Sequence, residues 1–336
     1  MRLRHEIGIS LLGITLLWTG ALAQVRIIQT NSAGDNIHLI DPATNAIVGE
    51  VKGVPINHGA AAAPDGTRLY FSSEADRTLN VVEVKTLATT KKIPLTGRPN
   101  NIFISPDGRR VYVAVVSEPG GIDVIDTGSL ERVKSIATKG GIHNVYVTPD
   151  GKHIVAGSIG GRHMAVFDAK TDEPLWTAFN EGVRPIAFEK NPDGSTKRAF
   201  VQLSEFHGFA IVDFAQKKEA GRVTLPEIPI EKRDTGPFNG APAHGIGVAP
   251  DGKTLWVCSR PNGQVYAYSL PDLKLLGGVE VGKRPDWLTF TPDSKRVYVA
   301  TESTNSVTVV DMAARKEVTR IKVGSAPKRN ITAVLR

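Results

Sequence analysis

The sequence has a single cysteine, Cys258, among its 336 residues. One cysteine cannot form an intramolecular disulfide or supply several thiolate ligands, which excludes a zinc ribbon and CxxC redox chemistry. The preceding Trp256 and Val257 belong to an apolar strand pattern, so we expect this thiol to be buried and unreactive.

Long hydrophobic stretches are also lacking. Residues 7–18 form a largely apolar run, which is shorter than the roughly 20 residues that a membrane-spanning helix needs. Arg2 and Arg4 precede this run and small residues follow it, which predicts a secretory signal peptide over residues 1–23. We therefore expect an exported protein, periplasmic or secreted, with no membrane span, whose mature chain forms one domain over residues 24–336.

The sequence contains none of the common catalytic motifs. It has no G-x-S-x-G elbow, P-loop, dinucleotide fingerprint, HExxH or CxxCH, and no block of five or more Lys or Arg residues. The net charge of +7 is spread along the chain, so a nucleic-acid-binding tail is not indicated. No cofactor is identified from the sequence.

What the sequence does have is glycine, proline and a repeat. Pro-Asp-Gly or Pro-Asp-Ser recurs every 42 or 43 residues, with one spacing of 58, starting at positions 64, 106, 149, 192, 250 and 292. Each tripeptide has the chemistry of a tight turn. Residues 101–105 before the second turn and 110–114 after it are rich in β-branched and aromatic residues, as expected of strands. Four short antiparallel strands per period are typical of a β-propeller blade.

The blade count predicts a closed ring. Six turns mark six innermost strands, whereas residues 25–53 contain only the three outer strands of a blade. Residues 330–335 form an unpaired strand at the other end, which can complete that blade. We therefore predict an all-β, seven-bladed propeller of four-stranded antiparallel blades, closed by pairing of the N- and C-terminal strands.

The repeats also resemble a known family. The segments RVYVATESTNSVTVVDMAARKEVTRIKVG (296–324), RVYVAVVSEPGGIDVIDTGSLERVKSI (from 110) and RIIQTNSAGDNIHLIDPATNAIVGEVKG (from 26) resemble the YVTN-type propeller repeat of exported bacterial proteins. The resemblance spans essentially all of the mature chain, although an intact Tyr-Val-Thr-Asn never occurs. Similar propellers include proteins linked to quinone-cofactor dehydrogenases and a single-stranded DNA binder; more distant ones include lactonases and the d1-haem domain of nitrite reductases. The resemblance specifies fold far better than function, because repeat consensus residues serve mainly turns and packing.

Candidate functional residues come from aligning the repeats on their turns. The residues six positions before each turn proline should meet at one mouth of the central channel, on the face opposite the turns: His58, Asn100, His143, Ile186, His244 and Asp286. Nearby loops on that face supply further candidate ligand-binding residues: Arg98, Arg184, His207 and Arg284, with Lys328 and Arg329 closing the ring. The same loops contain four acidic residues: Glu74, Glu118, Glu205 and Glu302.

The long spacing of 58 residues indicates an insertion on the same face. Its excess of roughly 16 residues falls within residues 226–242, which we call the inserted loop. We expect this loop to act as a lid or specificity loop.

These patterns leave several interpretations open. The histidines can lock neighbouring blades by hydrogen bonding, or His58, His143 and His244 together can hold a metal. The arginines suit an anionic ligand. The leading hypothesis is a monomeric binding or scaffold protein that recognises a protein or small molecule at the channel face. The alternative is a propeller hydrolase or lactonase, or an accessory of a quinone-dependent redox system, and a further alternative is single-stranded nucleic acid binding.

Overall fold

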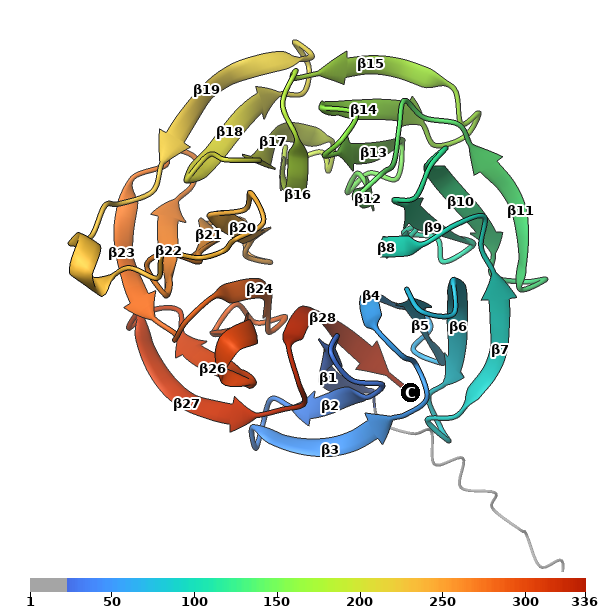
Figure 1. Ribbon diagram of the computed structural model, residues 1–336, viewed down its shortest axis with the longest axis horizontal. Helices are drawn as coiled ribbons and strands as arrows, with labels where there is room; N and C mark the ends of the chain where they lie inside the picture. Colours follow the sequence, from blue (N-terminus) through green and yellow to red (C-terminus); the bar gives the residue numbers. More distant parts are fainter. Residues whose placement is uncertain (1–22) are drawn as a thin grey trace, which may run out of the picture.

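The computed structural model describes residues 23–336, so residues 1–22 of the predicted signal peptide lie outside the described part. Seven four-stranded antiparallel sheets are arranged as blades around a central channel (Figure 1). This confirms the predicted seven-bladed propeller. We number the blades from the one that contains β1.

The strands follow one order in every blade, from the channel outwards. The innermost strands are β28 (Pro327–Leu335), β4 (Asn57–Ala62), β8 (Pro99–Ile104), β12 (Asn144–Val147), β16 (Val183–Lys190), β20 (Ala243–Val248) and β24 (Pro285–Phe290). The second strands are β1 (Gln24–Asn31), β5 (Arg68–Ser73), β9 (Arg110–Val115), β13 (His153–Ser158), β17 (Thr196–Leu203), β21 (Thr254–Ser259) and β25 (Arg296–Thr301). The third strands are β2 (Ile37–Asp41), β6 (Thr78–Glu83), β10 (Gly121–Asp126), β14 (His163–Asp168), β18 (Gly208–Asp213), β22 (Gln264–Ser269) and β26 (Ser306–Asp311). The outermost strands are β3 (Ala46–Val51), β7 (Thr89–Pro94), β11 (Glu131–Ile136), β15 (Pro174–Ala178), β19 (Lys218–Thr224), β23 (Leu275–Glu280) and β27 (Lys316–Lys322).

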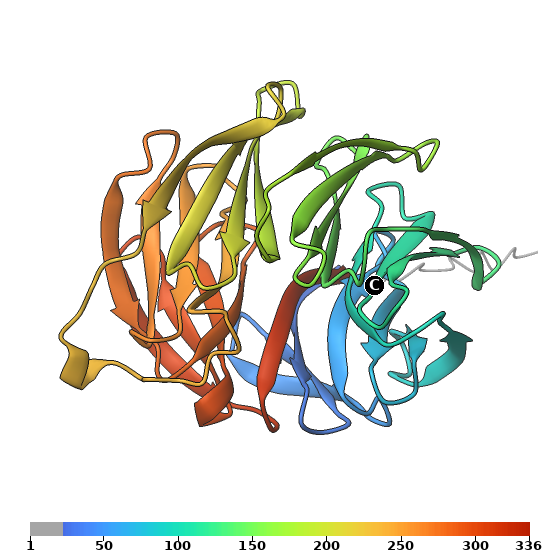
Figure 2. The same cartoon turned by 45° about the horizontal axis from the view of Figure 1, so that its top comes forward.

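The ring closes through blade 1, which both ends of the chain build. Strand β28 pairs antiparallel with β1, with Gln24 opposite Leu335 and Asn31 opposite Pro327. Figures 1 and 2 show β28 (red) beside β1 (blue). The predicted closure is confirmed, and β28 covers the edge of β1 that would otherwise face the channel.

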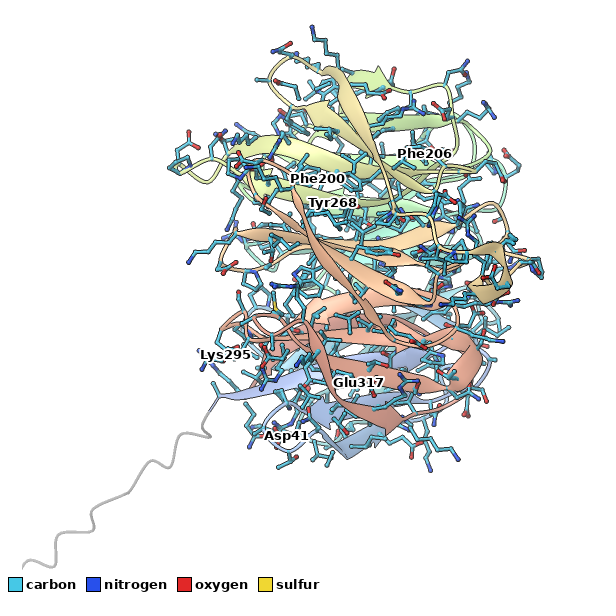
Figure 3. All side chains as sticks on the ribbon, turned by 90° about the vertical axis from the view of Figure 1, so that its left-hand side faces the viewer. Asp41, Phe200, Phe206, Tyr268, Lys295 and Glu317 are labelled. Atoms are coloured by element: carbon cyan, nitrogen blue, oxygen red, sulfur yellow. The ribbon has the colours of Figure 1, made fainter. Side chains whose placement is uncertain are left out.

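Hydrophobic side chains fill the spaces between neighbouring blades. Between blades 5 and 6, for example, the ring of Phe209 meets those of Phe200 and Tyr268 edge to face, with centroids 5.9 and 5.5 Å apart (Figure 3 labels Phe200 and Tyr268). Outermost strands instead carry charged side chains such as Glu317 (Figure 3). Cys258 is fully buried between blades 6 and 7, and burial raises the pKa of its thiol. The expected unreactive environment is therefore present.

Two short 3-10 helices, η1 (Ile230–Lys232) and η2 (Glu302–Thr304), are the only helices among residues 23–336. Helix η1 lies in the inserted loop, which connects β19 to β20, and stands at the outer edge of the ring (Figure 1). None of the helices in the described chain is long or apolar enough to cross a membrane. The two faces of the ring are named here by their loops: the turn face bears the Pro-Asp-Gly turns, and the mouth face bears the connections into the innermost strands.

Candidate functional site

Each innermost strand places one side chain at the channel entrance on the mouth face. The strand registers put Asn57 opposite Ser73 and Ala243 opposite Ser259, so His58 and His244 follow at equivalent positions. The seven side chains of this entrance are His58, Asn100, His143, Arg184, His244, Asp286 and Lys328. The histidines, asparagine and aspartate therefore occupy the positions that repeat alignment predicts.

One position in the predicted register is wrong. Repeat alignment selects Ile186 in blade 5, whereas the pairing of Val183 with Leu203 puts Arg184 at the entrance. The hairpin of β16 and β17 is longer than those of the other blades, with eight residues in each strand. The entrance residue of this blade therefore lies further from the turn than the six positions that repeat alignment assumes. Ile186 lies deeper in the channel.

A cavity of about 590 Å³ occupies one side of the entrance and is called the mouth cavity. It brings together five of the nine predicted ligand-binding residues, along with a carboxylate and a lysine: His58, Arg98, Asn100, His143 and Arg184, with Glu74 and Lys328. Val116 and Ile159 add apolar surface to its lining. A volume of this size accommodates a small organic molecule.

Glu74 links two of these side chains. Its Oε1 accepts a hydrogen bond from Nδ1 of His58 at 2.7 Å, and its Oε2 accepts one from Nη1 of Arg98 at 2.9 Å. Burial alone would raise the pKa of Glu74, but the contacts with His58 and Arg98 outweigh it and keep the pKa below its usual value. Glu74 is therefore an ionised carboxylate that orients an imidazole on one side and a guanidinium on the other.

His58 is held in one tautomer by this contact. Because Nδ1 donates its proton to Glu74, Nε2 carries the lone pair, and Nε2 makes no hydrogen bond to any residue of the described chain. Burial lowers the pKa of His58, and Lys328 lowers it further, whereas the hydrogen bond to Glu74 acts in the opposite direction. At neutral pH the imidazole is uncharged and can accept a proton.

His143 lies on the same cavity and is uncharged for a similar reason. Burial lowers the pKa of His143 to about 3. Its Nδ1 donates to Oδ1 of Asn144 at 2.6 Å, which again leaves Nε2 as the acceptor. The mouth cavity thus contains two neutral histidines whose tautomers are set by neighbouring side chains.

Positive charge surrounds these histidines. Arg184 donates through Nε to Oγ of Ser204 at 3.0 Å and through Nη2 to the carbonyl of Asn239 in the inserted loop. Burial and the nearby Arg260 lower the pKa of Arg184 to about 10, so it stays charged at neutral pH. Lys328 forms no ion pair with any residue between 23 and 336. The cavity therefore offers cationic groups to an anion or to a developing oxyanion.

The other side of the entrance is occupied by a buried ion pair. Arg260 pairs with Asp286, and Nδ1 of His244 donates to the backbone carbonyl of Asp286 at 2.9 Å. Burial raises the pKa of Asp286, but Arg260 and His244 hold it well below its usual value, while burial holds the pKa of His244 well below 6.5. His244 and Asp286 are absent from the mouth-cavity lining, so their predicted ligand contact is not part of this site.

The inserted loop covers this second side. Arg260 donates to the carbonyl of Phe238 at 3.0 Å, and Arg284 donates to Oδ2 of Asp234 at 3.2 Å. Residue 240 also accepts a hydrogen bond from the backbone of Glu205 at 2.9 Å. These contacts place the loop over blades 5 to 7 and make Arg284 a loop anchor, outside the mouth cavity.

His207 also lies outside the mouth cavity. Its Nε2 hydrogen-bonds Oγ of Ser259 at 2.8 Å, and Nδ1 is 3.9 Å from Glu227. The structure therefore separates His207, His244, Arg284 and Asp286 from the other predicted residues. His244 and Asp286 occupy entrance positions equivalent to those at the cavity, and Arg284 corresponds to Arg98. All four side chains, however, already have partners of their own.

The three mouth histidines are not gathered into a metal site. His58, His143 and His244 each direct Nδ1 to a different partner. Across the described ranges, no group of three or more His, Cys, Asp or Glu side chains has a metal-binding arrangement. The alternative of a three-histidine centre has no geometric support.

Two residues of the site carry weak signals in the sequence. Lys328 occupies the entrance position in blade 1, but that blade has no turn of its own on which to align it. Glu74 is one of four loop glutamates, and only its contacts with His58 and Arg98 distinguish it from Glu118, Glu205 and Glu302. The blade-6 counterpart of Glu74 is Arg260, since both directly follow the paired second strands.

Comparison with known proteins identifies the family. The family model described as the seven-bladed β-propeller lactonases matches residues 122–323, more than half of the chain. The chain belongs to this lactonase family. The match names the broader propeller family, so the YVTN type of repeat stays a prediction. No curated protein matches this lactonase-family chain at a significant level.

Solved structures share the fold of this family member across nearly its whole length. A Kuenenia stuttgartiensis hydrazine synthase chain is 25% identical, with a TM-score of 0.73 over 85% of this chain and 92% of its own. The periplasmic gluconolactonase PpgL of Pseudomonas aeruginosa is 17% identical, with a TM-score of 0.75 over 93% and 100%. A Bacteroides fragilis protein assigned as a 6-phosphogluconolactonase is 20% identical, with a TM-score of 0.74 over 95% and 99%.

The family match corrects the leading functional hypothesis from the sequence. A binding or scaffold protein was the first expectation, whereas membership of a lactonase family favours the alternative, a propeller lactonase. The first expectation is wrong because repeat residues define the blades and turns, which enzymes and binding proteins of this fold share.

Proposed function

We propose that this protein is a lactonase whose active site is the mouth cavity. The observation that carries the proposal is the bridging position of Glu74, which orients the neutral His58 and the charged Arg98 on the wall of a cavity of about 590 Å³. A proton acceptor and a cation held by one carboxylate suit the addition of water to a carbonyl group.

The hydrolysis proceeds through two proton transfers. Nε2 of His58 takes a proton from water while the water oxygen bonds to the lactone carbonyl carbon, and the carbonyl electrons move onto its oxygen. Arg98 stabilises this oxyanion. When the carbonyl re-forms, the ring C–O bond breaks, and His58 returns its proton to the ring oxygen. The product is a hydroxy acid, which releases its acidic proton to solvent at neutral pH.

Glu74 supports both transfers. Its negative charge stabilises the imidazolium that forms when His58 accepts the proton, and its hydrogen bond fixes the orientation of the ring. His143, also neutral, lines the same cavity and contacts the substrate. Asn100 and Arg184 line it too and bind substrate oxygens.

The substrate class is a lactone of a polar, acidic or phosphorylated sugar acid. The lining combines Arg98, Arg184 and Lys328 with only two carboxylates, Glu74 and Glu118, and Glu74 is already paired. Lys328 is the cation available to an anionic substituent. The gluconolactonase and the protein assigned as a 6-phosphogluconolactonase that share this fold agree with such a substrate.

The site of action is outside the cytoplasm. The basic and apolar start of the sequence resembles a secretory signal, and we place its cleavage before Gln24. A structural neighbour, the gluconolactonase PpgL, is described as periplasmic. Secretion of a fusion of residues 1–23 to a reporter tests this step.

The activity is tested with the mature chain on glucono-δ-lactone and on its phosphorylated form, by following acid release at constant pH against the spontaneous rate. We expect hydrolysis that is strongly reduced in His58→Ala and in Glu74→Gln. His207→Ala serves as the matched control, because His207 lies on the same face but outside the mouth cavity. Wild-type protein that never exceeds the spontaneous rate, or equal loss in all three variants, contradicts the proposal.

A further inference from the structure

A second cavity lies in the central channel, toward the turn face, and is called the channel cavity. Its volume is about 490 Å³, and residues from all seven innermost strands line it. Pro106 and Pro149, which begin two of the repeat turns, belong to its lining, so it lies toward the turn face. It shares no lining residue with the mouth cavity.

The wall of the channel cavity is largely apolar. Its large side chains are Phe103, Tyr146, Phe188, Trp287 and Leu288. The rings of Phe103 and Phe188 meet the ring of Tyr146 edge to face, with centroids 5.8 and 6.1 Å away. Such a wall favours an apolar molecule over water.

One buried cation, Arg329, interrupts this apolar wall. Its side chain is almost fully buried, with the residue 4% exposed, and its guanidinium lies over the ring of Trp287 at 3.7 Å from the centroid. Within the described chain the guanidinium forms no ion pair and its Nε is buried without a partner, while the hydroxyl of Tyr146 lies beside it. Burial lowers the pKa of Arg329, yet an arginine remains charged at neutral pH.

No carboxylate among residues 23–336 forms an ion pair with Arg329. Asp286 acts on it electrostatically, but that carboxylate is already paired with Arg260. A buried charge without a counter-ion is unfavourable, and stacking on Trp287 offsets only part of the cost. The cavity beside Arg329 is therefore chemically suited to an anion.

We propose that the channel cavity is a second binding site, for a small organic anion made of a carboxylate on an aromatic or branched alkyl body. The carboxylate pairs with the guanidinium of Arg329, for which two parallel hydrogen bonds are the preferred geometry. The body packs against Phe103, Tyr146 and Phe188 and excludes water from the pair. This site is independent of hydrolysis at the mouth face.

The test is titration of the mature protein with benzoate, followed by calorimetry and by tryptophan fluorescence. Benzamide has the same shape without the charge, and acetate has the charge without the body. We expect saturable binding of benzoate that is at least about tenfold tighter than that of either comparator. Equal affinity for benzamide, or no saturable binding of benzoate, overturns the proposal.

Two methionine variants locate the binding. Arg329→Met removes the channel cation, and we expect it to weaken benzoate binding at least about tenfold. Lys328→Met, one residue earlier but at the mouth cavity, is the matched control and keeps wild-type affinity. The reverse pattern places the anion at the mouth cavity and refutes the proposal.

A third variant tests the same site without removing Arg329, in case Arg329→Met does not fold. Ala62 is half-buried and lines the channel cavity, so Ala62→Leu narrows the cavity and keeps Arg329. We expect it to weaken benzoate binding while lactone hydrolysis is retained. Unchanged affinity in Ala62→Leu overturns the proposal. Because binding is read without turnover, failure of the lactonase assignment leaves this test intact.

Discussion

Blades 2 and 6 place equivalent histidines at the channel entrance, yet the two side chains have different surroundings. His58 in blade 2 donates to Glu74 and lines an open cavity. His244 in blade 6 donates to the backbone of Asp286, and Arg260 stands at the position that corresponds to Glu74. One blade thus pairs a histidine with a carboxylate, and the other pairs it with a buried salt bridge.

The difference shows that a repeated position does not imply a repeated role. A carboxylate beside His58 stabilises a protonated imidazole, whereas Arg260 beside His244 opposes protonation. The inserted loop adds to this contrast, because its carbonyl of Phe238 accepts from Arg260 on blade 6. The entrance position holds a proposed general base, His58, in blade 2 and a histidine hydrogen-bonded beside a buried ion pair, His244, in blade 6.

The largest expected effect is a difference in catalytic activity between variants of His58 and His244. His58→Ala removes the proposed base and should lower kcat by about 10²- to 10⁴-fold, a range typical of general base catalysis. His244→Ala, its counterpart in blade 6, should keep a kcat near that of the wild type in the folded fraction. Steady-state kinetics on a hydrolysed lactone measure both. A greater loss in His244→Ala would invert the comparison.

The pH dependence of activity sharpens this contrast. The base must be neutral, so kcat/KM falls as the pH decreases through the lowered pKa of His58. Glu74 raises that pKa, so Glu74→Gln should move the acid limb of the residual activity to lower pH. An acid limb that moves to higher pH would show that Glu74 does not act on the base.

The next largest effect concerns stability on the blade-6 side. Asp286→Asn leaves the buried Arg260 without a counter-ion and should lower the free energy of unfolding by about 3–5 kcal/mol. Glu74→Gln, on the blade-2 side, leaves Arg98, which is exposed and remains solvated, so its loss should be smaller. Urea unfolding at neutral pH compares the two. Similar losses would mean that the two sides are equally buried in solution.

Acidification should act on stability through His143. The pKa of His143 is about 3 in the folded chain and about 6.5 in the unfolded chain. Below pH 6.5 this imidazole is therefore protonated in the unfolded chain but stays neutral in the folded chain. Stability from this group is complete above pH 6.5 and declines as the pH falls toward 3, by about 2 kcal/mol at pH 5. Unfolding of the wild type and His143→Gln at pH 7 and 5 isolates this contribution. Identical pH dependence in both would contradict it.

The smallest effect tests the loop that distinguishes the two sides. Arg284→Met removes the partly exposed ion pair with Asp234 and should cost about 0.2–1 kcal/mol. Cleavage within residues 226–242 by a protease should become faster, because one anchor of the inserted loop is lost. Lys92→Met, which removes an exposed pair with Asp76 on blade 2, is the control. Equal cleavage rates would show that the remaining hydrogen bonds suffice to hold the loop.

The candidate site shows how far repeat alignment reaches. It correctly places His58, Asn100 and His143 at one entrance, because their hairpins have equal length. It fails in blade 5, where the longer hairpin shifts the entrance from Ile186 to Arg184. Repeat alignment also cannot distinguish the cavity residues from His207, His244, Arg284 and Asp286. The partners that occupy these four side chains come from other strands and from the inserted loop.

The sequence by itself determined the propeller, because turn tripeptides at a regular spacing and complementary terminal strands are local signals that each blade carries in its own residues. Only the tertiary structure decided which equivalent side chains share a cavity. That choice depends on contacts between blades, such as Arg98 reaching Glu74 and the inserted loop reaching Arg260. The unpaired Arg329 in the channel emerges in the same way, because burial and the absence of a counter-ion among residues 23–336 are properties of the closed ring.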